Sequence, residues 1–429
     1  MHVPITGVGA ITPFGLGFDA LWQAMVDGTC GITPLAEPLD LLRPGYGGQV
    51  STRWPELRPL PGARGHRPLT MTRYTYLACG GIGTALASAG VDLQADAERR
   101  GLYLGSYCNM DAMPKYIRLA HIIADRKAWD GEPHRIDDER VMLGLKRFTG
   151  FEFLKLMNNM PTAHGGIQAA CKGPCNTFLG FAAAGLQAVG RAGRAIEDGQ
   201  ADGMVTGGVG ASVADQVLLT RGFRFMLSSP EAAPEQACRP FDRGATGIVP
   251  GEAGGFLILG QPGAGGIPAD AEVIGELTGF ATGFEPPATH PGTPAGTGAA
   301  ISAARRALDE AGVEPDLVVL TGWSWAPMDS LEAAVHAEVL GDRAAEVPAL
   351  VLGPTLGSVE AASGPLGAAV ALRAMAEGVV PAWPNLTDPI PGWRGPTDTT
   401  ARSAKMKNAL ILSLSPEGSH AALVVAASA

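Results

Sequence analysis

Two cysteines four residues apart, Cys171 and Cys175, are the first residues of this sequence whose types and spacing suggest chemistry. A cysteine thiolate is both a nucleophile and a metal ligand, so such a pair could carry an acyl group or hold zinc. Structural zinc takes four ligands, and two thiols alone make a poor site, so we expect no metal. A nucleophilic cysteine would have to open a helix, where the thiol pKa falls.

The segment around these cysteines predicts a short strand followed by a helix. Residues 176–181 are typical of a strand, and the alanine-rich residues 183–196 have helical spacing. Cys171 falls in the turn before a Gly-Pro pair, and Cys175 falls at the start of the strand. Neither stands at the start of the helix, so both are predicted to pack as ordinary half-buried thiols.

The composition indicates a large globular protein. The chain has 429 residues, of which 46% are hydrophobic and 17% charged, enough to bury a substantial core. Its net charge of −10 argues against a nucleic-acid-binding surface. The apolar runs are too short for a membrane span, and the first nine residues do not read as a signal peptide. Its six scattered cysteines form no disulfide framework, so we expect a cytoplasmic protein.

Strand and helix patterns alternate along the chain, which favours sheets covered by helices. One of the predicted helices covers residues 332–340. A Gly- and Pro-rich stretch, 260–269, is the best candidate for a connection between two halves. We predict an α/β fold whose halves, 1–259 and 270–429, form one structural unit.

Three blocks, in order along nearly the whole chain, carry a family resemblance. They are Ile5 to Gly15, then Arg239-Pro240-Phe241-Asp242 with Gly247, Gly251 and Glu252, then Glu377 to Pro381 with Asn385-Leu386. Together they resemble the β-ketoacyl-ACP synthase family of the thiolase superfamily. The resemblance implies the thiolase fold, in which two similar halves stack as five α-β-α-β-α layers. It also implies a dimer joined by antiparallel pairing of the strand before the nucleophile, which here carries Phe178, Leu179 and Phe181.

The family's nucleophile position holds an alanine in this chain. In the family, a cysteine lies 20 residues before the Asp of a G-x-A-D turn and eight residues after a Gly-Pro pair. Asp202 ends the matching turn and Pro174 ends the matching pair, and both spacings lead to Ala182. An alanine cannot carry an acyl group.

The family's two catalytic histidines and its lysine are replaced as well. Counting back from the proline of the family's H-G-T-x-T-P loop places Gly322 at the first histidine. In the K-x-x-x-G-H block, Ser358 replaces the second histidine and Gly353 the lysine. In the family, these histidines donate hydrogen bonds to the charge that develops during decarboxylative condensation. Gly322 has no side-chain donor, and Ser358 has only a neutral hydroxyl.

The family's oxyanion loop, G-F-G-G-T-N, reads Ser-Pro-Glu-Gly-Ser-His at residues 415–420. Pro416 removes a backbone N–H where the family uses one. Glu417 would place negative charge near a site that must hold an oxyanion. Four independent losses therefore indicate a chain that is not itself catalytic.

Four other residues near these positions have side chains that could act, but we predict structural roles for them. His336 lies in a predicted helix and His420 just before the last predicted strand. Trp323 and Trp325 fall in the altered histidine loop and are predicted to fill the volume that the lost site leaves.

Among homologues without catalytic residues, the chain resembles the chain-length factors, or β subunits, of type II polyketide synthases. Such a subunit forms a heterodimer with a catalytic ketosynthase and shapes the tunnel in which a polyketide or polyene grows. The growing chain arrives on the phosphopantetheine arm of an acyl carrier protein. We expect the same partners and no cofactor for this chain, with a tunnel wall formed by Met110, Met113, Tyr116, Phe151 and Phe153.

Three alternatives remain open. The chain could decarboxylate malonyl carrier protein, although many chain-length factors have Gln where Ala182 stands, and no amide is present here to mimic an acylated thiol. It could be a homodimer that binds acyl carrier protein without chemistry. It could also be an active synthase or thiolase that uses Cys171 or Cys175.

Overall fold

The computed structural model describes ten segments of the chain, namely residues 1–35, 45–63, 69–107, 116–117, 119–120, 138–147, 150–213, 227–228, 233–286 and 295–428. Within them, one 11-stranded sheet has the strand order β11-β10-β14-β15-β9-β1-β8-β7-β5-β6, with β2 beside β1. The strands are β1 Val3–Thr12, β2 Gly15–Leu16, β5 Arg100–Ser106, β6 Cys175–Leu179, β7 Gly203–Ala211, β8 Glu252–Gly260, β9 Gly275–Phe284, β10 Leu317–Val319, β11 Ala349–Leu350, β14 Asn408–Leu414 and β15 Ser419–Ala427. Two short pairs stand apart, β3 Thr33–Pro34 with β4 Tyr46–Gly47, and β12 Val379–Val380 with β13 Arg402–Ser403.

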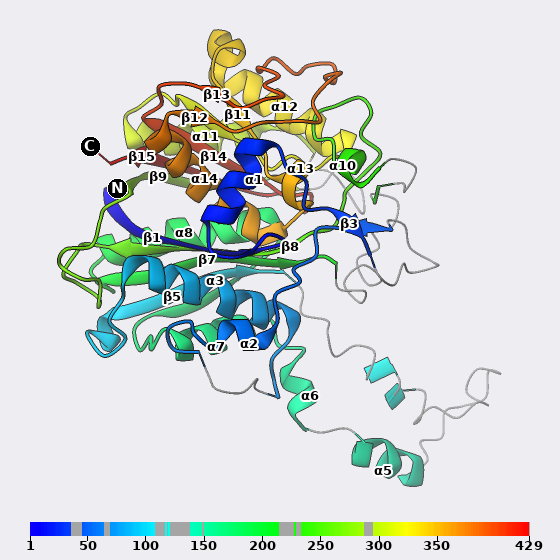
Figure 1. The fold of residues 1–429 in the computed structure, drawn as a ribbon, viewed down its shortest axis with the longest axis vertical. Coiled ribbons are helices and arrows are strands. Elements are labelled where there is room, and N and C mark those ends of the chain that lie inside the picture. The colour runs from blue at the N-terminus through cyan, green and yellow to red at the C-terminus, as the bar shows by residue number, and fades with distance from the viewer. Residues whose placement is uncertain are drawn as a thin grey trace.

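Helices cover both outer faces of the sheet, and two further helices lie between its two halves. They are α1 Asp19–Asp27, α2 Trp54–Leu57, α3 Arg73–Ala89, α5 Asp138–Arg147, α6 Gly150–Leu154, α7 Met160–Gln168, α8 Ala182–Glu197, α10 Pro234–Ala237, α11 Gly298–Ala311, α12 Ala326–Leu340, α13 Gly353–Leu356 and α14 Ser363–Glu377. The outer helix α3 contacts β1 and β8, and α11 contacts β9 and β15 on the opposite side. Between them, α8 and α14 contact strands of both halves (Figure 1). This is the five-layered thiolase fold that the sequence resemblance implies.

The two halves meet where β1 pairs with β9. Val3 lies opposite Leu277 and Ile5 opposite Gly275 in this antiparallel pair, while the rest of β1 pairs with β8. The strands of both halves therefore belong to one continuous hydrogen-bonded sheet. The proposed division into residues 1–259 and 270–429 stays a prediction.

Small residues hold α8 close to the strand β5. A Cβ atom on Gly105 would lie 2.4 Å from the backbone nitrogen of Gly185, and one on Gly185 would lie 1.8 Å from the carbonyl oxygen of Ala361. Only glycine fits at such close approaches of backbone to backbone. The start of α8 is thus fixed against β5 and against the 3₁₀ turn Glu360–Ala362.

The strand before α8 is slightly shorter than predicted. β6 ends at Leu179, and Phe181 is the residue that caps α8, so Phe181 does not belong to the strand. Gly180 bends the chain between the two elements and donates a backbone hydrogen bond to Ser106. β6 pairs in parallel with β5 alone, so its other edge has no strand partner among the described residues. No helix in the described parts of the chain combines the length and the apolar character that crossing a bilayer requires.

Candidate functional site

The positions that the sequence analysis singled out come together at one end of the sheet. Ala182 opens α8, Gly322 follows β10, Gly353 opens α13, and Ser358 precedes the 3₁₀ turn. All four line a single cavity, together with Trp323, Glu360 and neighbouring residues. The spacing arguments therefore select residues that are neighbours in space.

This cavity is almost completely filled. Its volume is about 10 Å³, which is about the least that can hold one water molecule. Ala182 is 1% exposed. A thioester on a phosphopantetheine arm could not enter the cavity without displacing protein atoms.

Trp323 is one of the side chains that close the cavity. It is buried, and its indole Nε1 donates a hydrogen bond of 2.8 Å to the carbonyl oxygen of Leu414. Its ring meets the ring of Phe181 edge-on, with 6.1 Å between centroids, and Phe181 stacks on Tyr107 at 4.1 Å. Three aromatic rings thus run from the end of β5, past the start of α8, to the loop after β10, and such contacts add to the free energy gained from their burial. Trp325, at the cap of α12, packs against the same hydrophobic core from its edge.

The backbone at Gly322 does not favour a side chain. Its φ is +64°, a conformation that favours glycine, and a Cβ atom would lie 2.7 Å from Cγ1 of Val351. Ser358 is held from both sides, since its N–H donates to the carbonyl of Val249 and its carbonyl accepts from Gly251. The R-P-F-D…G-E block therefore fixes the segment that carries Ser358.

Two buried carboxylates hold the loop that carries Trp323, and the sequence analysis missed both. Glu332 accepts hydrogen bonds from the backbone N–H groups of Thr321 at 2.7 Å and Gly322 at 3.0 Å. Asp329 accepts from Trp323 at 2.9 Å and from Phe241 at 3.1 Å. The signal was Pro327, because proline is common in the first turn of a helix. α12 starts at Ala326, before the predicted start at residue 332, and so contains Asp329 as well as Glu332.

The same two carboxylates have raised pKa values. Burial raises the pKa of Asp329 to about 8 and that of Glu332 to about 7, although the backbone donors oppose the rise. A carboxyl group that binds its proton more tightly when folded stabilises the fold at low pH. That contribution is present below the unfolded pKa near 4 and is lost as the pH rises through 7 to 8.

We expect Glu332→Gln to weaken the pH dependence of stability. Between pH 6.5 and 8, the free energy of unfolding of the unmodified chain should fall, and the variant should remove about 1 kcal/mol of that fall. Urea unfolding at several pH values measures the difference. Glu338→Gln is the matched control, since Glu338 lies on the same helix with a side chain 59% exposed. Equal slopes in the Glu332→Gln variant and the unmodified chain would contradict the prediction.

The turn between β14 and β15 closes over the start of α8. Ser415 accepts a hydrogen bond from the Ala183 N–H at 3.0 Å, and Glu417 accepts one from the Phe181 N–H at 3.0 Å. Pro416, between them, offers no N–H. The carboxyl group of Glu417 thus lies at the start of α8, where it contacts the residue before Ala182.

Neither cysteine of the first pair is placed as a nucleophile. Cys171 donates a hydrogen bond to the carbonyl oxygen of Gly101, and burial raises its thiol pKa to about 12. Cys175 lies on β6, where desolvation also raises the thiol pKa. Both thiols therefore stay protonated at neutral pH, and neither stands at the start of a helix.

The two singled-out histidines are buried and neutral. Burial lowers the pKa of His336 to about 4, and its ring stacks on Trp393 with 4.8 Å between centroids. Burial likewise lowers the pKa of His420 to about 4. Within the described residues, the ring nitrogens of His336 have no hydrogen-bond partner. Neither ring lines the cavity beside Ala182.

A separate hollow runs along the free edge of β6. It has a volume of about 760 Å³ and is lined by residues of β6, α7 and the connection between them. Leu179 on β6 is 59% exposed, and Ile167 on α7 is similarly exposed. Phe178 instead turns toward the sheet and packs against Tyr103, with 5.7 Å between ring centroids.

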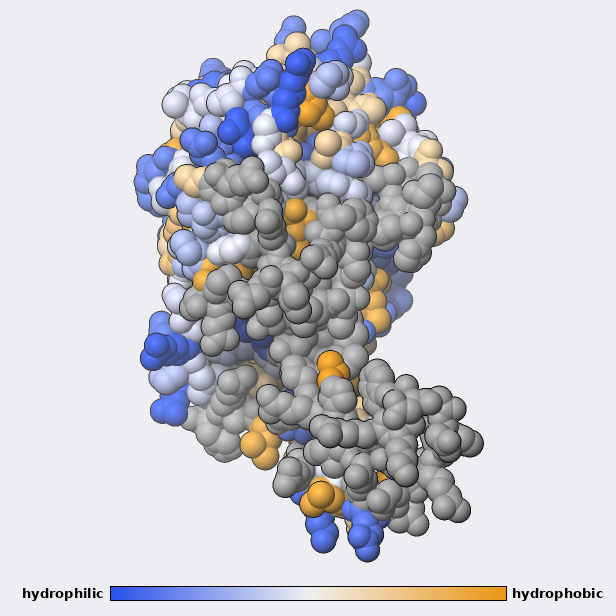
Figure 2. Space-filling model, turned by 90° about the vertical axis from the view of Figure 1, so that its right-hand side faces the viewer, coloured by the Kyte–Doolittle hydropathy of each residue, from blue (hydrophilic) through white to orange (hydrophobic). Residues whose placement is uncertain are grey.

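Of the predicted tunnel residues, the structure describes Tyr116, Phe151 and Phe153. Met110 and Met113 lie outside the described residues, and Tyr116 is half-buried. Phe151 and Phe153 are exposed on α6. This helix and α5 belong to a projection from the body, and exposed apolar side chains lie on it (Figures 1 and 2). The assignment of a tunnel wall stays a prediction.

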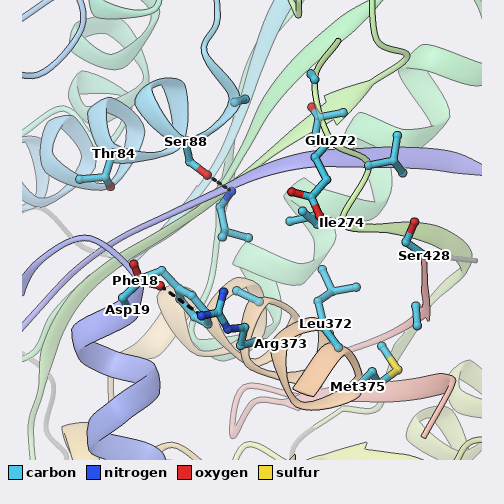
Figure 3. A pocket seen from close by; sticks show the side chains of 18 of the residues that line it. Phe18, Asp19, Thr84, Ser88, Glu272, Ile274, Leu372, Arg373, Met375 and Ser428 are labelled. Atoms are coloured by element: carbon cyan, nitrogen blue, oxygen red, sulfur yellow. Dashed lines mark hydrogen bonds and ion pairs between the residues drawn. The ribbon is translucent and has the colours of Figure 1, made fainter. Parts of the chain in front are cut away.

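A second hollow, of about 940 Å³, lies at the end of the strands opposite to the cavity beside Ala182. Figure 3 shows side chains that line it. Arg373 faces it and forms an ion pair with Asp19 at 3.7 Å, and Ser88 accepts a hydrogen bond from the Val8 N–H. The described residues that line it include no cysteine and no histidine. This hollow therefore presents neither a thiol nor an imidazole among the described residues.

Comparisons with known proteins agree with this fold. The chain matches the β-ketoacyl synthase N-terminal domain over residues 1–262 and the C-terminal domain over residues 274–387. It is 27% identical to 3-oxoacyl-acyl-carrier-protein synthase 2 of Synechocystis sp., over 91% of this chain and 89% of that protein. It is 29% identical to the actinorhodin polyketide β-ketoacyl synthase 2 of Streptomyces coelicolor, over 89% of this chain and 87% of that protein.

Two solved structures have the same fold. One is the ishigamide ketosynthase/chain length factor, with a TM-score of 0.81, 22% identity, and coverage of 100% of this chain and 99% of the other. The second is a type II PKS acyl-carrier protein in complex with its ketosynthase, with a TM-score of 0.81, 21% identity and the same coverage. The family matches span most of the chain, and the chain therefore belongs to the β-ketoacyl synthase family.

Proposed function

We propose that this chain is a non-catalytic ketosynthase-like subunit, a chain-length factor, that forms a heterodimer with an active ketosynthase in type II polyketide biosynthesis. The observation that carries the proposal is the filled cavity at Ala182, which has neither a nucleophile nor room for a thioester. The similarity to the actinorhodin polyketide β-ketoacyl synthase 2 and to the ishigamide ketosynthase/chain length factor supports a role in type II polyketide biosynthesis.

The free edge of β6 supports the proposed heterodimer with a ketosynthase. An unpaired strand edge with exposed apolar side chains favours pairing with another chain, and Leu179 and Ile167 lie along this edge. In this proposal, the partner's strand continues the sheet there. The exposed Phe151 and Phe153 then face the partner and, with Met110, Met113 and Tyr116, shape the tunnel for the growing chain.

The remaining partner in the proposal is an acyl carrier protein, which brings the growing chain to the ketosynthase. The proposal requires no cofactor in this subunit. It also places the complex in the cytoplasm, and the described cysteines, all free thiols, suit a reducing compartment.

Co-expression with a type II ketosynthase that has an intact Cys-His-His set tests the proposal. We expect a 1:1 complex by size-exclusion chromatography and little soluble chain without the partner, because obligate interfaces bury more than about 2,000 Å². Labelled acyl groups supplied on acyl carrier protein should then appear, by intact mass, on the ketosynthase only.

Each contrary outcome of this experiment supports a different alternative. A stable soluble monomer would count against the heterodimer, and a stable homodimer that binds carrier protein would support a binding role. An acyl adduct on Cys171 or Cys175 would indicate an active enzyme. Release of carbon dioxide from malonyl carrier protein by the isolated chain would indicate a decarboxylase.

A further inference from the structure

The start of α8 is already occupied by groups of the same chain. The first backbone N–H groups of any helix have no partner inside the helix, and they carry partial positive charge. α8 is 16 residues long and is regular from its first residue, Ala182. Its Ala183 N–H donates to Ser415 Oγ at 3.0 Å, and the N–H of its capping residue Phe181 donates to Glu417 Oε1, also at 3.0 Å.

Several contacts hold this carboxylate in place. A Cβ atom on Gly180 would lie 3.2 Å from Glu417 Oε1, so the glycine leaves room for the carboxylate to approach the backbone. The turn that carries Glu417 is tied to Ala183 by Ser415, and to Trp323 by the carbonyl oxygen of Leu414. The carboxylate is therefore built into the site by the surrounding fold.

We propose that Glu417 acts as an internal anion that neutralises the start of α8, so that position 182 can stabilise neither a thiolate nor an acyl oxyanion. In this proposal, the Glu417 carboxylate occupies the position at the helix start where a thiolate or an acyl oxyanion would otherwise be stabilised. The inference concerns the electrostatics of one helix end and does not depend on the partner, so it stands or falls separately from the proposed heterodimer.

The sign of the effect can be tested with a thiol placed at position 182. A helix start lowers a thiol pKa, whereas a nearby carboxylate raises it. A unit charge roughly 6 Å away, in surroundings of effective dielectric constant about 20, changes a pKa by one pH unit or more. Removal of the Glu417 charge should therefore expose the effect of the helix.

We would measure this pKa in two purified variants, Ala182→Cys and Ala182→Cys/Glu417→Gln. The ultraviolet absorbance of the thiolate is followed against pH, and the same titration without Ala182→Cys is subtracted in each background. This readout requires no reagent to enter the filled cavity. We expect a pKa at or above the ordinary thiol value of about 8.5 in the single variant, and a value lower by about one pH unit or more in the double variant.

Glu56→Gln in the Ala182→Cys background is the matched control. Glu56 accepts a hydrogen bond of 2.7 Å from the N–H of Arg53, the capping residue of α2, so it has the same type of contact on another helix. This control should leave the pKa at position 182 unchanged. Glu417→Ser provides a second removal of the charge, and circular dichroism verifies that each variant folds. The same pKa with and without the Glu417 charge, or a low pKa already in the single variant, would overturn the proposal.

Discussion

Ala182→Cys, which places a thiol where the family has its nucleophile, is expected to leave the isolated chain without condensation activity. The sulfur would stand at the first residue of α8, but the other groups of the reaction would still be missing. Loss of one oxyanion donor costs about 10²–10³ in rate, and Pro416 lacks the N–H that the family uses. Gly322 and Ser358 supply neither imidazole.

The residues around position 182 are expected to lower the condensation rate further than the missing donors alone. The cavity of about 10 Å³ beside Ala182 does not admit a thioester. The backbone at Gly322, with a φ of +64°, resists the side chain that would restore the first histidine. Turnover at the new thiol is therefore not expected.

The assay supplies acyl and malonyl carrier proteins to the Ala182→Cys chain, free of partner, and compares product with that of the unmodified chain. Ala182→Ser serves as the control that adds a polar atom without a thiol. Condensation near the rate of a normal synthase would contradict the assignment of Gly322 and Ser358 to the histidine positions. The catalytic donors would then lie elsewhere in the chain.

Leu179→Asp is expected to weaken the complex with a ketosynthase by about 100-fold or more. Leu179 is 59% exposed at the free edge of β6, where the proposed interface would bury it. An unpaired carboxylate in a buried interface costs several kcal/mol, and about 3 kcal/mol already corresponds to a 100-fold change in affinity. The isolated variant should also be more soluble, because a charge at a strand edge opposes aggregation.

Co-purification of a tagged ketosynthase with each variant measures the effect. Phe284→Asp is the matched control, because Phe284 is 66% exposed at the end of β9, in the other half of the chain. Ile167→Asp, on the α7 side of the same hollow, should behave like Leu179→Asp. Intact complexes with both Leu179→Asp and Ile167→Asp would place the partner on another surface.

The helical spacing of residues 183–196 was sufficient to predict α8, and the spacings from Pro174 and Asp202 that the family resemblance implies place Ala182 at its start. Ala182, Gly322 and Ser358 were predicted one at a time, and the structure brings them to one cavity. The strand before α8 was predicted to end two residues too late, because Gly180 bends the chain before Phe181.

The sequence did not predict which groups close the cavity. The predicted start of α12 at residue 332 left Asp329 outside the helix, and the buried face that carries Asp329 and Glu332 was not recognised. The contact of Glu417 with the Phe181 N–H depends on the path of a turn 236 residues away in the chain. Such contacts follow from the packed fold, and no local pattern carries them.

The position of β1 has a consequence for how the protein is made. This strand is synthesised long before β8 and β9, yet Ile5 pairs with Leu259 on one side and Gly275 on the other. Nearly all of β1 is buried in the finished fold. β1 therefore remains without its partner strands β8 and β9 while more than half of the chain is synthesised. Contacts so distant in sequence slow folding, and the waiting strand is open to misassembly. Slower synthesis at low temperature, or a chaperone that shields this segment, should raise the yield of folded protein.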